Sequence, residues 1–129
     1  MITTRTNETL QEGLYHEWLN NLAMYQQELW HLEEMLTGTG HRKEMHVDTS
    51  IELDALHELI ETQHKVIAEL SEEVLQKMQQ LKPMEGSHEG VIAFAEVLRN
   101  NQLREKIRKA EHAVFYLKYH VNKLLSIAS

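Results

Sequence analysis

The turn-forming residues of this chain are confined to two short segments, and this limits the folds that the chain can adopt. Four of the five glycines and the single proline fall in TGTGHRKEMHVD, residues 37–48, and KPMEGSHEG, residues 82–90. Between these segments the chain is rich in Leu, Glu, Gln, Lys and Ala, which favour helices. Aromatic residues make up only 6% of the chain, and apolar residues show little of the alternation that a β-strand needs. The sequence therefore predicts an all-α protein.

We expect three helices over about residues 7–37, 49–82 and 91–127, all within one domain that spans residues 1–129. Apolar residues recur along each helix every three or four positions, the spacing typical of a buried helix face and of a coiled coil. Connections of roughly ten residues or fewer make sequential helices antiparallel. The expected architecture is an elongated antiparallel three-helix bundle. Its core positions would be Leu14, Trp18, Leu22, Tyr25, Leu29, Leu32 and Leu36, then Leu53, Leu56, Ile60, Gln63, Ile67, Leu70, Val74 and Leu81, and finally Leu103, Ile107, Ala110, Val114, Leu117, Val121 and Leu124.

Local signals indicate where these helices begin and end. Asn7 or Thr9 is a suitable N-cap for the first helix, and Thr49 is one for the second. Gly38 fits the position that follows the end of the first helix. Pro83 cannot continue the second helix and stops it near residue 82.

Large apolar residues also occur outside the three core seams. Met24 and Trp30 lie on the flanks of the first helix, and on the third helix Phe115, Tyr116 and Tyr119 face away from the core positions. Large aromatic residues gathered on a secondary face are typical of an association surface. We therefore expect a homo-oligomer, with a two-fold dimer that completes a larger bundle.

The net charge of −7 is divided unevenly along the chain. Residues 1–40 carry −5, residues 51–82 carry −4 and residues 91–129 carry +4. The basic run RNNQLREKIRK has no aromatic residue between its cations to stack on bases, and the acidic chain repels phosphate at long range. We therefore expect no nucleic-acid partner. The basic third helix should instead pair with the acidic helices, within the bundle or across a dimer.

Composition excludes several chemistries and compartments. The chain has no cysteine, which excludes disulfides, thiolate zinc sites and cysteine nucleophiles. The N-terminal segment MITTRTNETLQEG lacks the apolar core of a signal peptide, and no apolar run approaches the roughly 20 residues that cross a bilayer. We expect a cytoplasmic protein that does not bind membranes.

The chain is rich in histidine, with nine histidines in 129 residues. In the stretch HELIETQH, residues 57–64, a helix would align His57, Glu61 and His64 in one stripe. Neutral imidazoles and carboxylates suit iron, zinc or manganese, so this stripe is a candidate metal site. The alternatives are histidines that hydrogen-bond to neighbouring glutamates without metal, and an interface that responds to pH.

Two segments have the pattern Glu-x-x-His, ELWH at residues 28–31 and ETQH at residues 61–64. Paired motifs of this kind hold the two metals of ferritin-like bundles. An antiparallel turn about residues 38–48 would place His31 level with residue 55 and His64 level with residue 22. The motifs would then be offset by ~13 Å along the bundle, and we expect them not to share a metal.

The same register brings a different set of side chains within about two helical turns of one another. His31 and His112 point away from the core seams, so a site that used the whole set would need a second chain or another helix rotation. The candidate ligands for a transition metal ion are His57, Glu61, His31, His112 and His120.

Enzymatic motifs are missing from the sequence. It has no Gly-rich phosphate loop and no nucleophile elbow. We expect no catalytic residues and no cofactor. We expect a self-associating helical module that acts through protein contacts, with an unidentified protein as a further partner. The alternative is a metal-binding bundle for storage, sensing or redox chemistry.

Overall fold

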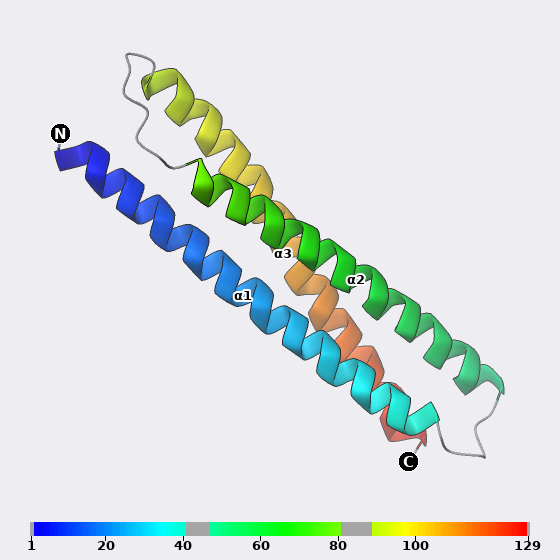
Figure 1. Cartoon of the computed structure of the whole chain (residues 1–129). Helices are drawn as coiled ribbons and strands as arrows, with labels where there is room; N and C mark the ends of the chain where they lie inside the picture. The colour runs from blue at the N-terminus through cyan, green and yellow to red at the C-terminus, as the bar shows by residue number, and fades with distance from the viewer. Residues whose placement is uncertain (1, 41–46, 81–88, 129) are drawn as a thin grey trace.

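The chain forms three long α-helices that pack against one another. In the computed structural model these are α1 (Ile2–Gly40), α2 (Val47–Gln79) and α3 (Glu89–Ala128). The chain runs along α1, returns along α2 and runs back along α3, which gives an elongated bundle (Figure 1). The structure describes the backbone of residues 2–40, 47–80 and 89–128, and the side chains of residues 11–38, 47–80 and 100–126.

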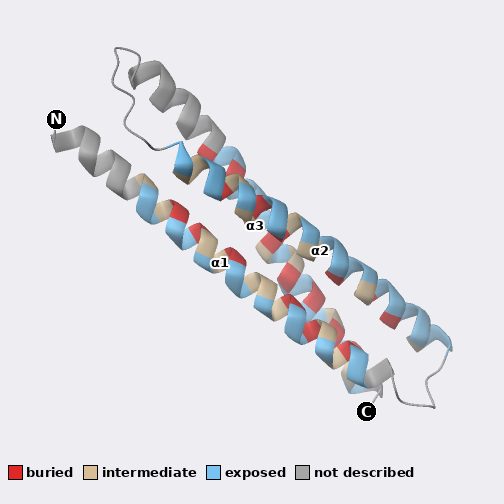
Figure 2. Cartoon of the chain, in the orientation of Figure 1, coloured by how far each residue is buried: buried red, intermediate tan, exposed pale blue. Residues whose placement is uncertain are grey.

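The predicted fold class is confirmed at this level, because the three described segments are helical and contain no strand. None of the described helices has a stretch apolar enough to cross a bilayer. Buried positions, drawn in red, recur along the sides of the helices that face one another (Figure 2).

The ends of α1 differ from those that local signals indicated. The helix begins at Ile2 rather than near Asn7, so Asn7 and Thr9 lie inside it and do not act as caps. It continues through Gly38 to Gly40, and no described glycine has a positive φ. Gly38 therefore does not adopt the left-handed conformation that terminates many helices.

The other helix ends lie closer to the expected positions. The second helix begins at Val47, which places Thr49 in its first turn rather than at its cap. It ends at Gln79, and Pro83, expected to stop it, lies outside the described residues. The third helix begins at Glu89, close to the expected residue 91.

The core follows the predicted apolar spacing, with instructive exceptions. Tyr15, which the spacing did not place in the core, is fully buried, whereas its neighbour Leu14 is only partly buried. Tyr25 and Gln63 are half-buried rather than buried, and Leu81 lies outside the described residues. The buried apolar residues are Tyr15, Trp18, Leu22, Leu29, Leu32, Leu36, Leu53, Leu56, Ile60, Ile67, Leu70, Val74, Leu103, Ile107, Ala110, Val114, Leu117, Val121 and Leu124.

Tyr15 can be buried because a polar residue of α3 accepts a hydrogen bond from its hydroxyl group. The Tyr15 hydroxyl donates to Asn100 Oδ1 at 2.9 Å, and Lys77 Nζ donates to the same oxygen at 3.3 Å. One amide oxygen thus joins all three helices at one end of the core. Buried tyrosines need such a partner, and these bonds fix the helices relative to one another along the bundle.

Ion pairs also join α3 to the other two helices. Lys106 Nζ lies 3.6 Å from Glu73 Oε1 on α2, and Lys118 Nζ lies 3.5 Å from Glu28 Oε2 on α1. The expected pairing of a basic third helix with two acidic ones is therefore confirmed within the bundle. All four side chains are well exposed, so each pair stabilises the fold only weakly.

Candidate functional site

His64 is a largely enclosed histidine at the contact between α1 and α2. Its side chain is 15% exposed and lies against α1, where Nδ1 hydrogen-bonds to Gln26 Oε1. The Gln26 amide donates to the backbone oxygen of His64 at 3.0 Å. The Trp30 ring covers the imidazole at a centroid distance of 4.4 Å. His64 Nε2 lies 3.7 Å from Glu33 Oε2, too far for a hydrogen bond, and is buried without another partner.

These contacts show that the register predicted for α1 and α2 was wrong. His64 was expected level with residue 22, but it touches Gln26, Trp30 and Glu33, one to three turns further along α1. The two Glu-x-x-His motifs therefore lie side by side rather than ~13 Å apart. The shift has a simple physical cause. If one helix slides along the other by a whole turn, the apolar faces of both helices stay buried. Burial therefore does not determine the register, and polar contacts such as the one between Gln26 and His64 select it.

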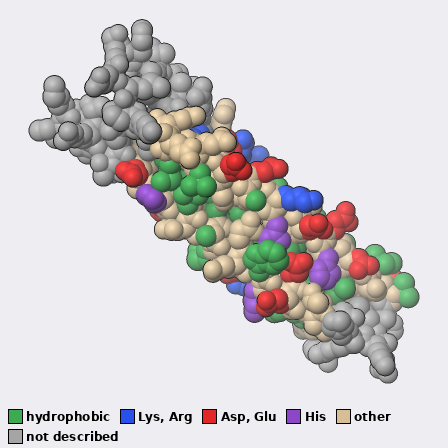
Figure 3. Space-filling view, in the orientation of Figure 1, with side chains coloured by type: hydrophobic (Ala, Val, Ile, Leu, Met, Phe, Trp, Pro, Cys, Tyr) green, Lys and Arg blue, Asp and Glu red, His purple; other side chains and the backbone are tan. Residues whose placement is uncertain are grey.

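Alignment in height does not make the two motifs into a metal centre, because their side chains diverge. Glu28 points toward α3, where it pairs with Lys118. His31 and Glu61 are exposed. Only His64 turns into the contact between α1 and α2. Histidine, acidic and hydrophobic side chains are interspersed on the face that α1 and α2 form together (Figure 3).

The predicted metal ligands are spread over three helices, and only His57 and Glu61, one turn apart on α2, are neighbours on one helix. His57 is half-buried on α2, and His112 is exposed beside the groove between α1 and α3. His120 is half-buried and packs on aromatic rings of its own helix, at 4.2 Å from Tyr116 and 5.3 Å from Tyr119. Within the described part of the chain, no group of three or more histidine or acidic side chains could hold a metal ion. Metal binding by these residues stays a prediction.

A surface of exposed aromatic residues lies on α3, and we call Phe115, Tyr116 and Tyr119 the aromatic surface. Their exposed fractions are 61%, 58% and 64%. Leu117 and Val114, between and beside them in the sequence, are buried, so the helix has one side in the core and the other in solvent. The expectation that these aromatics face away from the core is confirmed. The spacing of apolar residues was sufficient for this prediction because buried residues recur along the whole described length of one side of α3.

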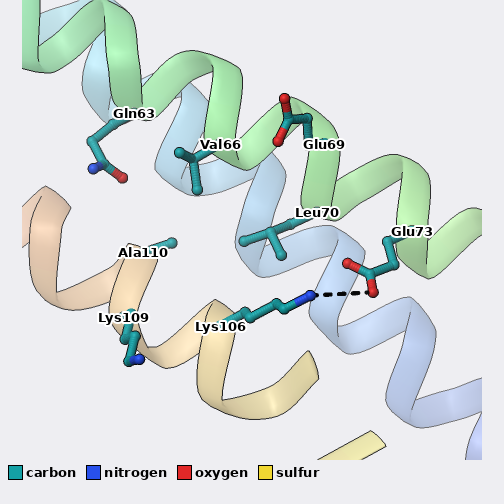
Figure 4. A pocket seen from close by; sticks show the side chains of 8 residues that line it. All are labelled: Gln63, Val66, Glu69, Leu70, Glu73, Lys106, Lys109 and Ala110. Atoms are coloured by element: carbon teal, nitrogen blue, oxygen red, sulfur yellow. Dashed lines mark ion pairs between the residues drawn. The ribbon is translucent and has the colours of Figure 1, made fainter. Parts of the chain in front are cut away.

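A groove of about 330 Å³ runs between α2 and α3. The ion pair between Glu73 and Lys106 spans it, while Glu69 and Lys109 point outward at its opposite edges (Figure 4). Gln63 also lines the groove, and its buried Oε1 has no hydrogen-bond partner. One edge of this groove is therefore acidic and the other basic.

A second groove, between α1 and α3, contains a tyrosine with a strongly shifted pKa. Tyr25 hydrogen-bonds to the Glu111 carboxylate across this groove. Burial, that hydrogen bond and the negative charge of Glu111 all favour the neutral phenol and raise the pKa of Tyr25 to about 12. The bond strengthens the contact between α1 and α3 but leaves no reactive group at neutral pH.

Sequence reasoning missed the polar contacts between helices. Gln26 was assigned no role, and Trp30 was placed on an outer flank without a neighbour, although it covers His64. Asn100 was assigned to a polar stretch, although it is buried beside Tyr15. The sequence contained one signal for these contacts. Trp30, a large aromatic residue, lies one helical turn from the polar residue Gln26 at the edge of an otherwise apolar helix face.

Comparisons with known proteins add no family to this picture. No protein-family model matches the chain, and neither curated proteins nor solved structures give a match. The fold and the surface described above therefore define the class, which is an all-α bundle with an exposed aromatic surface.

Proposed function

We propose that this chain is a self-associating helical module whose principal partner is a second copy of itself. The observation that carries this proposal is the aromatic surface of α3, three large side chains that are each more than half exposed within two helical turns. Aromatic residues are enriched in the cores of interfaces because they bury much area at little entropic cost. Such a cluster on a small bundle is a candidate contact surface rather than ordinary exposure.

The area of this surface fits a modest interface. An aromatic side chain presents ~200 Å², so three that are about 60% exposed offer roughly 350 Å² per chain. A specific interface needs about 800 Å² per partner. The aromatic surface would supply close to half of this, and the neighbouring exposed side chains of α2 and α3 would supply the rest. We expect dissociation in the micromolar range, because fewer than half of the contacts would come from large aromatic side chains.

Sedimentation equilibrium tests the proposal directly. At tens of micromolar the particle mass should be twice the 15.1 kDa of one chain. Replacing Tyr116 and Tyr119 together by serine should yield monomers whose helicity and melting temperature are unchanged at high dilution, since both side chains are exposed. Met24→Ser is the matched control, because Met24 is 53% exposed but lies on α1, and this variant should remain dimeric. A wild-type mass of one chain at these concentrations would overturn the proposal.

The metal-binding alternative ranks second. Its best support is His64 Nε2, which is buried without a hydrogen-bond partner 3.7 Å from Glu33 Oε2, a geometry that a bound cation would relieve. Structural zinc sites use four ligands, and the described residues offer no group of three. Metal analysis of untagged protein, together with thermal shift on adding zinc, manganese or iron, separates the two functions. A metal content near one equivalent would favour the alternative.

We further propose that the role is not enzymatic. The α2–α3 groove is lined by an ion pair, an amide and apolar side chains, and in the α1–α3 groove the phenol of Tyr25 beside Glu111 has a pKa raised to about 12, which keeps it neutral. The cytoplasmic location expected from the sequence stays a prediction, as does the existence of another protein partner.

A further inference from the structure

We infer that the side of α3 that carries Tyr116 and Lys109 packs against α2 of the second copy, with the two-fold axis parallel to the long axis of the bundle. This inference rests on the self-association proposed above and specifies which surfaces meet. It follows from the positions of apolar and charged side chains on the face that α2 and α3 form together.

An exposed apolar residue of α2 and an exposed aromatic residue of α3 lie at nearly the same height on this face. The Glu73–Lys106 ion pair fixes the relative positions of the two helices. Counting equal numbers of residues from that pair along the antiparallel helices brings Tyr119 level with Ile60. Leu59, the neighbour of Ile60, is 44% exposed. Each copy therefore offers an exposed leucine on α2 and, within about one turn of its height, Tyr116 on the side of α3 that also carries Lys109.

Two copies can bring this face together in two symmetric ways. An axis parallel to the helices places α3 of each copy over α2 of the other. An axis across the helices, within the interface, places α3 on α3 and α2 on α2. Both arrangements bury apolar side chains, so apolar contact alone does not choose between them.

Electrostatic interactions favour the two-fold axis that is parallel to the helices. Residues 51–82, which include most of α2, carry −4, and residues 91–129, which include most of α3, carry +4. The axis across the helices would set the acidic helix on its own copy and the basic helix on its own copy, which is unfavourable at close approach. The parallel axis sets the basic helix of each copy on the acidic helix of the other.

Two side chains at the edges of the α2–α3 groove make this choice specific. Glu69 and Lys109 are both exposed and point outward from opposite edges (Figure 4). They form no ion pair with each other among the described contacts, whereas Glu73 and Lys106 neutralise one another. Counted from that pair, Lys109 is level with Leu70 and so with the adjacent Glu69. A parallel axis preserves height, so Lys109 of each copy would approach Glu69 of the other.

A charge-swap experiment tests this pairing. Lys109→Glu alone and Glu69→Lys alone should each weaken their own dimer about tenfold, because two attractive contacts become repulsive. An equimolar mixture of the two variants should form mixed dimers with close to the wild-type dissociation constant. The readout is sedimentation velocity with one variant fluorescently labelled. Glu34→Lys is the control, since it makes the same charge change at an exposed position on α1, and it should neither weaken the dimer nor rescue Lys109→Glu.

Distances across the dimer provide a second measurement. The chain has no cysteine, so Asn101→Cys would introduce one spin-label site at an exposed position of α3. A parallel axis keeps the two labels at one height and within about 30 Å, given helix spacings of 8–10 Å. An axis across the helices at the level of Tyr119 would separate them by ~50 Å.

The outcomes separate this inference from the proposed function. Mixed dimers together with a short label distance support the α3-on-α2 arrangement. A dimeric wild type with no recovery in the mixture, or with the long label distance, would overturn the arrangement and leave self-association intact. A monomeric wild type would overturn both.

Discussion

The hydrogen bond between Tyr15 and Asn100 should hold the three helices in register, and its removal is the sharpest test of the fold. Replacing Tyr15 by phenylalanine removes only the hydroxyl that donates to Asn100 Oδ1 at 2.9 Å. Lys77 still donates to that oxygen at 3.3 Å, so the amide keeps one partner. The ring remains in a fully buried site, and no cavity larger than an oxygen atom is created.

The expected cost follows from these contacts. A buried neutral hydrogen bond contributes about 1 kcal/mol, so Tyr15→Phe should lower the free energy of unfolding by about that amount. Asn100→Ala also removes the acceptor of Lys77 and part of a buried side chain, and should cost about 2 kcal/mol. The double variant should be less destabilised than the sum of the two, with a coupling energy of about 1 kcal/mol.

Urea unfolding followed by circular dichroism at one fixed protein concentration measures all three variants. Fixed concentration is needed because self-association adds to apparent stability. Additive effects, with a coupling energy below about 0.3 kcal/mol, would refute the claim that this bond joins α1 to α3. A Tyr15→Phe variant as stable as the wild type would do the same.

Three further changes probe single contacts. Tyr25 has a pKa of about 12 in the folded chain against 10.0 ordinarily, so its contribution to stability is complete below pH 10 and is lost as the pH rises through 12. Urea midpoints across that window should fall more steeply for the wild type than for Tyr25→Phe. Gln63→Leu removes a buried oxygen without a hydrogen-bond partner and should stabilise the chain by about 1 kcal/mol, whereas a lower melting temperature would show that the oxygen is solvated. Trp30→Ala uncovers His64 and should cost about 1 kcal/mol while speeding modification of His64 by diethyl pyrocarbonate, and an unchanged rate would contradict the covering role.

The sequence predicted which sides of the helices are buried but not how the helices slide along one another. Leu22, Ile60 and Leu117 are buried as expected, because the spacing of apolar residues identifies a helix face without reference to its neighbours. Register depends on contacts between helices that no local pattern encodes. Gln26 and His64 are far apart in sequence, yet their hydrogen bonds set a register at least one turn from the expected one. The prediction of which metal ligands lie at the same height along the bundle used the same wrong register between α1 and α2.

The aromatic surface was predictable from the sequence for the same reason as the core, since it occupies the positions of α3 that the core spacing leaves out. The residues that surround the aromatic surface could not be predicted from the sequence. That Tyr116 and Tyr119 enclose His120 depends on side-chain packing along the helix. That Leu59 lies at the same height depends on the α2–α3 register. The predicted association surface thus had the right residues on α3 and no partner residues on α2.

The division of charge between helices has two consequences that the sequence alone does not separate. Lys106 and Lys118 are used inside one chain, where each pairs with an acidic residue of a neighbouring helix. Glu69 and Lys109 form no pair with each other and point outward. A bundle that neutralised all its charges internally would give a second copy no electrostatic preference for one orientation. Incomplete internal pairing leaves the α2–α3 face acidic on one side and basic on the other. The aromatic surface attracts a second copy in either orientation, so this residual charge pattern would select the orientation.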